Sequence, residues 1–280
     1  MKKITRRSFL AAAGLSVAAL ALTACGGSSS SVASSVASSA AASSEAASTS
    51  AAAGELTTVE AGKLTMATNA AFPPYEMTTD AGEFEGIDIE TAQAIADKLG
   101  LELQIDDMDF DAALLSVQQG KADIVMAGVT VTDERKAVMD FSDSYATGIQ
   151  SIIVPEGSDI ASPDDLADKM IGTQRGTTGY IYCSDDFGDE NVVAYDDGLT
   201  AVQALNNGQV DAVVIDNAPA QEFVAANPGL KILDTSYAEE DYAIGMAKNS
   251  PLEDAVNSAL EELKADGTLQ SIVDKYITAE

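Results

Sequence analysis

Hydrophobic and polar positions after residue 62 alternate between the periods that are typical of strands and of helices. Residues 63–68, in which polar residues alternate with Leu64 and Met66, predict a strand. Residues 88–99 carry apolar side chains at helical spacing and are followed by Gly100, which predicts a helix with Asp88 as its N-cap. A second strand is predicted at residues 101–105. This order of strand, helix and strand is typical of an α/β fold.

An internal repeat extends this pattern. Residues 111–119 predict a helix that stops at Gly120, before an apolar strand over residues 124–127. Residues 116–128 align without gaps on residues 204–216, and both copies read as a helix end, a glycine, a polar residue, an aspartate and a buried strand. The surrounding pattern repeats as well, so we infer two similar α/β lobes. Ligands of open α/β sheets lie beyond the carboxyl ends of the strands, which places the candidate site at the ends of these two strands.

Two extended apolar runs, at residues 148–155 and 242–247, predict that the chain crosses between the lobes twice. If the chain crosses at the first run and returns at the second, one lobe comprises residues 55–150 plus 245–280. The other lobe comprises residues 151–244. Two crossings of this kind form a hinge.

The C-terminal helices are clearly marked in the sequence. Ser250 to Glu253 reads as a capping box with Pro251 at the first helical position. Gly267 is expected to end this helix, before a last helix that reaches Ile277. The predicted buried face of the first helix consists of Leu252, Val256, Leu260 and Leu263.

The N-terminal residues have the pattern of an export signal. Residues 1–24 begin with positive charges and continue as an alanine-rich apolar stretch, which predicts a signal peptide. The apolar part is too short for a membrane-spanning helix, which needs about 20 residues. The stretch ends in Leu-Thr-Ala-Cys, which resembles the lipobox of bacterial lipoproteins. Cys25 is therefore predicted to be lipidated and to anchor the exported chain to the outer face of the cell membrane. The pair Arg6-Arg7 resembles a twin-arginine signal, but the ordinary positive charge of a signal peptide accounts for it equally well.

Residues 25–54 consist almost entirely of Gly, Ser, Ala and Val, with Glu45 as the one charge. Such a segment cannot bury enough apolar surface to offset the entropy lost on ordering. We therefore interpret it as a linker between the predicted lipid anchor and a globular part that begins at residue 55.

Composition narrows the function classes. The chain has 15 basic and 45 acidic residues, a formal net charge of −30, which disfavours a nucleic-acid partner. It has no histidine, and Cys183 is the one cysteine besides Cys25. Zinc sites and Ser-His-Asp chemistry are thereby excluded, and no metal or cofactor is expected. Without histidine to activate it, Cys183 is expected to be a structural thiol.

Arginine is used sparingly after the signal. Only Arg135 and Arg175 occur there, although nine lysines do. Arginine offers a planar fork that matches a carboxylate, which lysine cannot replace. Arg135 follows the strand that ends at Gly128, so it is a candidate to hold a ligand carboxylate. A surface ion pair of Arg135 with a neighbouring acid, Asp133 or Glu134, is the alternative, and position alone favours neither.

A resemblance to a known family bears on this choice. Eight motifs carry it, in this order: Ala67–Glu76, Gly86–Ala96, Met108–Asp111, Ala127–Arg135, Asp140–Asp143, Gly172–Gly179, Val210–Asp216 and Leu263–Thr268. Together they resemble the extracellular solute-binding proteins of family 3, the polar amino-acid receptors of ABC importers. The match covers nearly all of residues 60–278.

The resemblance implies an α/β, two-lobed periplasmic-binding-protein-like (type II) fold with two hinge crossovers. It implies a monomeric binding protein, not an enzyme, that closes around an amino acid and delivers it to an ABC transporter permease in the membrane. Arg135 would hold the ligand α-carboxylate, together with the Gly128 backbone N–H and the Thr130 hydroxyl. Asp216, at the matching strand end of the other lobe, would hold the α-ammonium. The backbone and hydroxyl of Thr178 would complete the carboxylate cage.

The remaining ligand-binding residues that the resemblance implies lie around these groups. Phe72 and Phe110 would pack against the ligand side chain, although either could instead belong to the core. Thr177 would lie near the carboxylate, or simply cap the following helix. Tyr75 is expected to pack behind the site, and Arg175 to face solvent. The set is completed by Asn69, Gln174 and Ala127, of which Asn69 and Gln174 would border the ligand side chain.

One position departs from many relatives. Those for cationic amino acids carry Asp or Glu where this chain has Asn69, so a neutral or polar amino acid is favoured, unless Asp107 or Asp109 substitutes. Two alternatives to a transport receptor are an enzyme of the same fold, such as a cyclohexadienyl-type dehydratase, and a ligand-sensing extracellular domain. A dehydratase needs a general acid, and Asp216 is the one acid among the matched pocket positions.

Overall fold

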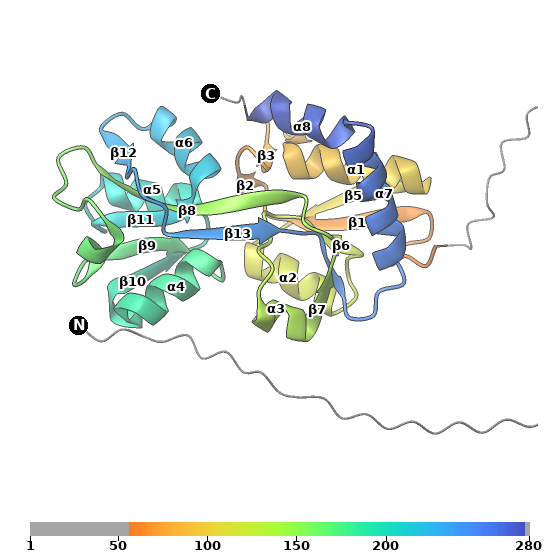
Figure 1. Ribbon diagram of the computed structural model, residues 1–280, viewed down its shortest axis with the longest axis horizontal. Coiled ribbons are helices and arrows are strands. Elements are labelled where there is room, and N and C mark those ends of the chain that lie inside the picture. Colours follow the sequence, from red (N-terminus) through yellow and green to blue (C-terminus); the bar gives the residue numbers. More distant parts are fainter. Residues whose placement is uncertain (1–55, 278–280) are drawn as a thin grey trace, which may run out of the picture. The chain divides into compact units, whose positions relative to one another are not determined.

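Two β-sheets, each flanked by helices, make up the part of the chain that the computed structural model describes, residues 56–277 (Figure 1). The predicted signal peptide, the predicted lipidation site Cys25 and all of the predicted linker lie outside the described residues. Within residues 56–277 no helix is long and apolar enough to cross a membrane.

The first sheet has the strand order β5-β1-β6-β14-β7. β1 (Lys63–Thr68) lies between β5 (Glu102–Asp107) and β6 (Ile124–Val125) and is parallel to both. The other two strands, β14 (Gly245–Ala247) and β7 (Met139–Phe141), are antiparallel to their neighbours. A strand from late in the chain thus lies inside the first sheet, as the predicted return crossing requires.

Five helices and a small sheet accompany the first sheet. α1 packs against α7 and α8, and α2 lies against β1 and β14. The small sheet consists of three short strands beside the pocket described below. The bounds are α1 (Ile87–Leu99), α2 (Phe110–Gln118), α3 (Asp133–Val138), α7 (Glu253–Ala265), α8 (Thr268–Tyr276), β2 (Ala71–Phe72), β3 (Glu76–Thr78) and β4 (Phe84–Glu85).

The second sheet has the order β10-β9-β11-β8-β12, and β13 also pairs with β8. Its helices are α4, α5 and α6, and two short 3₁₀ turns, η1 and η2, lie in its connections (Figure 1). The bounds are β8 (Ala146–Pro155), β9 (Ile171–Gln174), β10 (Val192–Tyr195), β11 (Ala212–Asp216), β12 (Leu230–Ile232), β13 (Ala238–Tyr242), α4 (Thr178–Phe187), α5 (Gly198–Asn206), α6 (Asn217–Ala226), η1 (Pro163–Leu166) and η2 (Asp189–Asn191).

The strands β8 and β13 connect the two halves. Residues 146–150 of β8 pair antiparallel with residues 238–242 of β13, and in Figure 1 the two strands run side by side between the halves. The chain leaves the first sheet after β7 and re-enters it at β14, which confirms the two-lobed fold with two crossovers. The predicted lobe boundary at residue 150 falls inside β8. Residues 146–150 of this strand pair with β13, and the rest of the strand continues into the second sheet.

The start of α1 differs from the prediction. α1 begins at Ile87 after Gly86, so Asp88 is not its N-cap, whereas Gly100 ends the helix in the left-handed conformation as predicted. Asp88 is instead fully buried, and its carboxylate accepts hydrogen bonds from the Gly128 N–H at 3.0 Å and the Tyr145 hydroxyl at 2.7 Å. Tertiary donors thus stabilise this carboxylate in place of the helix end.

The predicted capping box at α7 is also wrong. α7 begins at Glu253, and its N-cap Leu252 makes no side-chain capping bond. The Ser250 hydroxyl accepts a hydrogen bond from the Leu252 N–H at 3.2 Å, so Pro251 lies in a turn that precedes the helix. The predicted apolar face is confirmed, since all four of its residues are at most 2% exposed: Leu252, Val256, Leu260 and Leu263.

Candidate functional site

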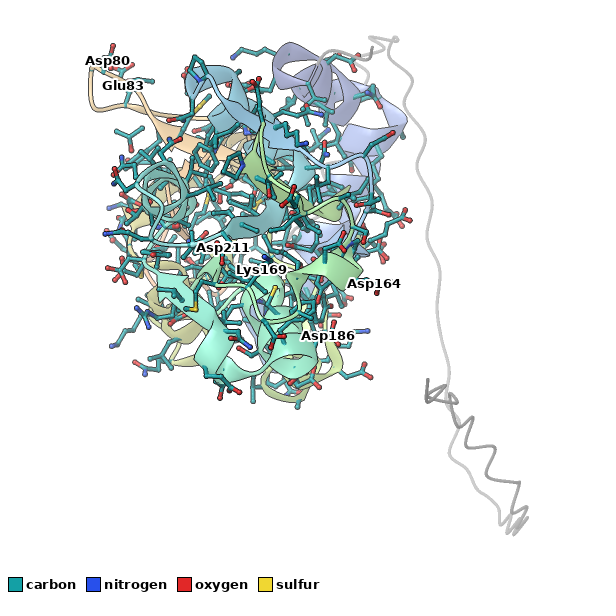
Figure 2. The ribbon with its side chains drawn as sticks, turned by 90° about the vertical axis from the view of Figure 1, so that its left-hand side faces the viewer. Asp80, Glu83, Asp164, Lys169, Asp186 and Asp211 are labelled. Atoms are coloured by element: carbon teal, nitrogen blue, oxygen red, sulfur yellow. The ribbon has the colours of Figure 1, made fainter. Side chains whose placement is uncertain are left out.

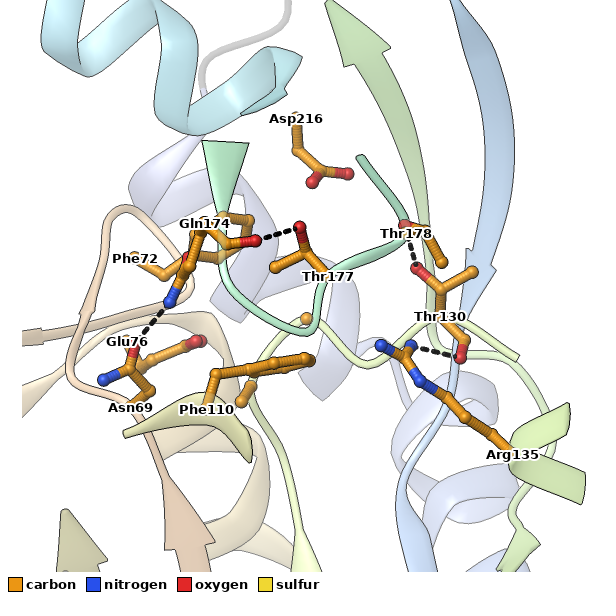
Figure 3. Close-up of a pocket in the computed structure, with 12 residues that line it drawn as sticks. Asn69, Phe72, Glu76, Phe110, Thr130, Arg135, Gln174, Thr177, Thr178 and Asp216 are labelled. Carbon is orange, nitrogen blue, oxygen red and sulfur yellow. Dashed lines mark hydrogen bonds between the residues drawn. The ribbon is translucent and has the colours of Figure 1, made fainter. Parts of the chain in front are cut away.

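A single pocket brings together all eleven predicted ligand-binding residues (Figure 3). The pocket lies where strands of both sheets end. It also contains Glu76, which sequence reasoning did not assign to the site. The lining residues are Asn69, Phe72, Glu76, Phe110, Ala127, Gly128, Thr130, Arg135, Gln174, Thr177, Thr178 and Asp216.

Arg135 provides the positive charge of the pocket. Its position at the start of α3 is fixed by Thr132, whose hydroxyl caps the helix by accepting the Arg135 N–H. The side chain is only 8% exposed, and its guanidinium donates to the Thr130 carbonyl at 2.8 Å and the Gly176 carbonyl at 3.1 Å. It also lies over the Phe110 ring, 5.4 Å from the ring centre.

The alternative role for Arg135, a surface ion pair, is not what the structure shows. No carboxylate of residues 56–277 lies within salt-bridge distance of its guanidinium. Burial lowers the pKa of Arg135, although nearby Glu240 opposes that shift. A guanidinium has five N–H donors, and two bonds to carbonyls leave others for a ligand. This desolvated cation, not balanced by an ion pair, is suited to bind a carboxylate.

Asp216 provides a negative charge from the other lobe. It is the last residue of β11 and is 8% exposed. One carboxylate oxygen accepts a hydrogen bond from the Tyr242 hydroxyl, and the other accepts from Gln150 Nε2 at 2.8 Å. Burial raises the pKa of Asp216 to about 6, while the Tyr242 bond opposes this rise. A cation and an anion therefore face one pocket from two lobes, which is the pattern a zwitterion requires.

The hydroxyls of Thr130 and Thr178 point to a group that sequence reasoning missed. Both lie within hydrogen-bonding distance of Glu240 Oε2, at 3.3 Å and 2.9 Å. A hydroxyl has one hydrogen, so neither hydroxyl can also donate to a ligand carboxylate in this arrangement. Thr178 still offers its backbone N–H, because the first N–H groups of a helix lack intrahelical partners and Thr178 begins α4. Glu240 is buried on β13, and nothing in its local sequence marks it as inward-facing.

Two other predicted contacts are occupied within the protein. The Gly128 N–H donates to Asp88, as described above, so the structure does not direct it at a ligand. Thr177 caps α4 by accepting the Tyr180 N–H, which is the alternative that the sequence left open, and it lines the pocket as well. The carboxylate donors that remain in the pocket are Arg135 and the backbone at the start of α4.

The far end of the pocket is built from amides and aromatic rings. Gln174 Nε2 donates to Asn69 Oδ1 at 2.8 Å, a bond that joins the two lobes. Phe72 and Phe110 are both buried and line the pocket. Gly128 has a positive φ of 55°, and a Cβ there would lie 2.8 Å from the Phe72 ring, so only glycine lets the ring approach this closely.

Glu76 is the unexpected member of the pocket. It begins β3 and is 0% exposed, and neither of its carboxylate oxygens has a hydrogen-bond partner among the described residues. Burial and the neighbouring Asp88 raise the pKa of Glu76 well above its usual range. The residue stands in the motif 67–76, but a lone acid at the end of a motif gives no sign of the direction in which it points. Neither Asp107 nor Asp109, the suggested acids, lines this pocket.

Three other residues that the sequence singled out lie outside the pocket. Arg175 is exposed and pairs with Asp196 at 3.2 Å. Tyr75 packs between Phe72 and Tyr242, behind the pocket wall. Cys183 is a buried free thiol, and burial raises its pKa to about 12. Within the described part of the chain, no group of His, Cys, Asp and Glu side chains could hold a metal ion.

A two-lobed α/β fold with opposite charges facing one pocket between the lobes defines a solute-binding protein of the periplasmic type. Residues 64–279 match the family model of bacterial extracellular solute-binding proteins, family 3, and the chain belongs to this family.

Three relatives illustrate the similarity. The L-cystine-binding protein TcyJ of Escherichia coli (strain K12) is 32% identical over 79% of this chain and 85% of its own length. The arginine-binding extracellular protein ArtP of Bacillus subtilis (strain 168) is 32% identical over 78% of this chain and 87% of its own. The crystal structure of the arginine-, lysine-, histidine-binding protein ArtJ from Geobacillus stearothermophilus superposes with a TM-score of 0.75. It is 34% identical and covers 78% of this chain and 96% of its own.

Proposed function

We propose that this chain is the substrate-binding component of an ABC importer, which captures an α-amino acid between its lobes and delivers it to a membrane permease. One observation carries the proposal: Arg135 and Asp216, both buried, face the same pocket from different lobes. Arg135 takes the ligand α-carboxylate with the Thr178 N–H, and Asp216 takes the α-ammonium. Because each lobe supplies one charge, binding of a zwitterion favours the closed arrangement.

The side-chain end of the pocket favours a cationic amino acid. The expectation of a neutral or polar ligand rested on Asn69, but Glu76 supplies a carboxylate beside it. A buried carboxylate without donors is costly, and a guanidinium or ammonium would provide donors and favour the ionised form. The names of two relatives, one for arginine and one for arginine, lysine and histidine, support a correction from a neutral to a cationic side chain.

Catalysis is the alternative that Glu76 brings back. A dehydratase needs a general acid, and Glu76 is an acid of the pocket besides Asp216. We nevertheless infer a binding role, because the named relatives are binding proteins. A dehydratase that used Glu76 as its acid would also have to place its substrate's leaving group at the end of the pocket that Asn69 and Gln174 border, because Glu76 lies there (Figure 3).

A thermal-shift screen tests the proposal. The purified chain is unfolded and refolded to remove carried-over ligand, then heated with each of the twenty amino acids and with carboxylic acids that lack an α-ammonium. A ligand that binds the folded state alone raises the melting temperature by mass action. We expect the largest rise with L-arginine, L-lysine or L-histidine. Stabilisation by the deaminated acids alone would contradict the proposal and favour an enzyme or a sensor of such acids.

Replacing Glu76 is expected to change the ligand preference. Glu76→Gln keeps the size of the side chain but removes its charge, and a hydrogen bond to a charged group contributes about 1.5–3 kcal/mol. The affinity for L-arginine is therefore expected to fall about 10-fold to 100-fold, while that for L-glutamine stays equal or rises. Calorimetry measures both. The matched control is Glu83→Gln, which removes the same charge from the exposed β3–β4 turn (Figure 2). Equal changes for both ligands would exclude Glu76 as the side-chain contact.

The predicted lipid anchor is tested separately. The chain is proposed to be exported and tethered through Cys25, so Cys25→Ser is expected to release it from the membrane fraction into the soluble fraction. Labelling with a fatty acid should fail in the same variant. Cys183→Ser is the matched control, because Cys183 is buried inside the folded part and cannot be acylated there. A soluble wild-type chain, or one that stays membrane-bound after Cys25→Ser, would contradict the anchor.

A further inference from the structure

We propose that Tyr242 and Gln150, which lie on the two strands that cross between the lobes, are positioning residues that fix Asp216 as the acceptor of the ligand α-ammonium. The hinge itself would then carry the preference for α-amino acids over acids that lack the amino group. This inference rests on the proposed amino-acid receptor, but its first measurement below requires no ligand.

The bonds to Asp216 determine its orientation. The Tyr242 hydroxyl donates to Oδ1, and Gln150 Nε2 donates to Oδ2 at 2.8 Å, so each oxygen has one donor from the hinge. Gln150 is also the cross-strand partner of Asp216 in the pairing of β8 with β11. A carboxylate oxygen has two lone-pair sites, so one acceptor site on each oxygen is left for an ammonium. The carboxylate is thus held in place without losing its capacity to bind.

Tyr242 is held firmly enough to act as such a support. It is fully buried, and its ring packs edge-on against Tyr75 with ring centres 5.3 Å apart. On the other side, a Cβ at Gly148 would lie 2.5 Å from the ring and its hydroxyl oxygen, so only glycine leaves room for it. An isolated bridge between Thr130 and Tyr242 also ties β13 to the first lobe. Among the described residues, the hydrogen bond of the Tyr242 hydroxyl goes to Asp216.

The same bonds affect the charge state of Asp216. Burial and the neighbouring Glu240 raise its pKa, while the bonds from Tyr242 and Gln150 favour the ionised form. Gln150 directs its second N–H to Glu240 at 3.0 Å, which keeps the amide between the two acids. The titratable or charged groups that interact electrostatically with Asp216 are Glu240, Tyr242, Tyr75, Glu76 and Arg135. Tyr242 is the one that donates to it, so loss of the hydroxyl should raise the pKa of Asp216 and weaken its hold on an ammonium.

The matched variants are Tyr242→Phe and Tyr145→Phe. Tyr145 is also buried and donates its hydroxyl to a buried carboxylate, that of Asp88, which does not line the pocket. In the ligand-free full chain, ¹³C NMR follows the titration of the Asp216 carboxyl, assigned by its loss in Asp216→Asn. We expect Tyr242→Phe to raise the pKa of Asp216 and Tyr145→Phe to leave it unchanged. An unchanged pKa in Tyr242→Phe would overturn the proposal whatever the ligand.

Calorimetry then separates positioning from a general structural role. The probes are L-arginine and 5-guanidinopentanoic acid, which is arginine without its α-amino group. We expect Tyr242→Phe to lower the affinity for L-arginine about 10-fold, the effect of losing one hydrogen bond. The affinity for the deaminated acid should stay unchanged. Equal weakening of both probes would mean that Tyr242 only supports the fold, and would refute the proposal. If wild-type chain binds neither probe, the proposed ligand class fails, and the NMR result alone decides the positioning role.

Discussion

Arg135→Ala is expected to abolish amino-acid binding, with at least about a 100-fold loss of affinity for L-arginine, the equivalent of two charge-assisted hydrogen bonds. Arg135 is the cation of the pocket, and the Thr130 and Thr178 hydroxyls are turned toward Glu240. Little else can therefore receive the α-carboxylate. Calorimetry of the refolded chain measures the loss. Near-wild-type affinity would show that the carboxylate binds elsewhere.

Arg175→Ala is the matched control for this prediction. Arg175 is the other arginine of the described part of the chain, and it forms an exposed ion pair with Asp196. Exposed ion pairs contribute little to stability, so this variant should bind and fold like the wild type. Arg135→Lys provides a second comparison, because it keeps the charge but loses the planar fork. An intermediate affinity for Arg135→Lys would support bidentate recognition.

The burial of Arg135 changes what its removal does to folding. From the sequence, Arg135 lies in a surface loop and its loss should leave stability nearly intact. In the structure its guanidinium donates to the carbonyls of Thr130 and Gly176 and lies on Phe110. We therefore expect a measurable fall in the melting temperature of Arg135→Ala. Circular dichroism at the temperature of the calorimetry confirms that the variant is folded when its affinity is measured.

The sequence predicted the fold wherever one local pattern decided the outcome. Residues 63–68 form β1 with the predicted bounds, because this segment is short and lies between turn-forming residues. The predicted apolar face of α7 is buried, because residues at helical spacing lie on one face wherever the helix begins. The predicted start of α1 was wrong because Asp88 accepts hydrogen bonds from Gly128 and Tyr145, far away in the chain. The predicted start of α7 was wrong because Pro251 lies in a turn that precedes the helix. Capping rules consider neighbours in sequence only.

The sequence predicted which residues line the pocket, apart from Glu76, but it did not predict their hydrogen bonds. The family motifs place Asn69, Phe72 and Arg135 at strand ends and loops, and such positions converge once the two lobes form. Glu76 and Glu240 escaped notice because an acid on a short strand gives no sign of which way it faces. The direction of each hydroxyl depends on acceptors from other strands, as for Thr130 and Thr178. The expectation of a neutral or polar ligand rested on Asn69 alone and did not include Glu76, for the same reason.

Asp216→Asn is expected to lower the affinity for L-arginine about 100-fold or more at pH 7.5, because the variant loses a buried charge partner. The amide keeps the size of the side chain, so packing against β8 should survive. Its NH₂ group, however, meets the donors of Tyr242 and Gln150, and it cannot offset the charge of an ammonium. The affinity for 5-guanidinopentanoic acid should hardly change, because that ligand has no α-ammonium. A similar loss for both ligands would remove Asp216 from its proposed role.

The pH dependence of binding gives the same assignment an independent test. The pKa of Asp216 in the empty pocket is about 6 because of burial, and a bound ammonium favours the ionised form. The ligand therefore binds the deprotonated state, so wild-type affinity for L-arginine should fall as the pH drops through about 6. Glu76 adds a fall of the same sign, since its pKa is also raised by burial. In Glu76→Gln the remaining fall belongs to Asp216, and Asp216→Asn in that background should make the affinity independent of pH between 5 and 7.5. A fall that persists in the double variant would have to come from Asp88, whose pKa is also about 6 and whose carboxylate accepts the Gly128 N–H behind the pocket wall.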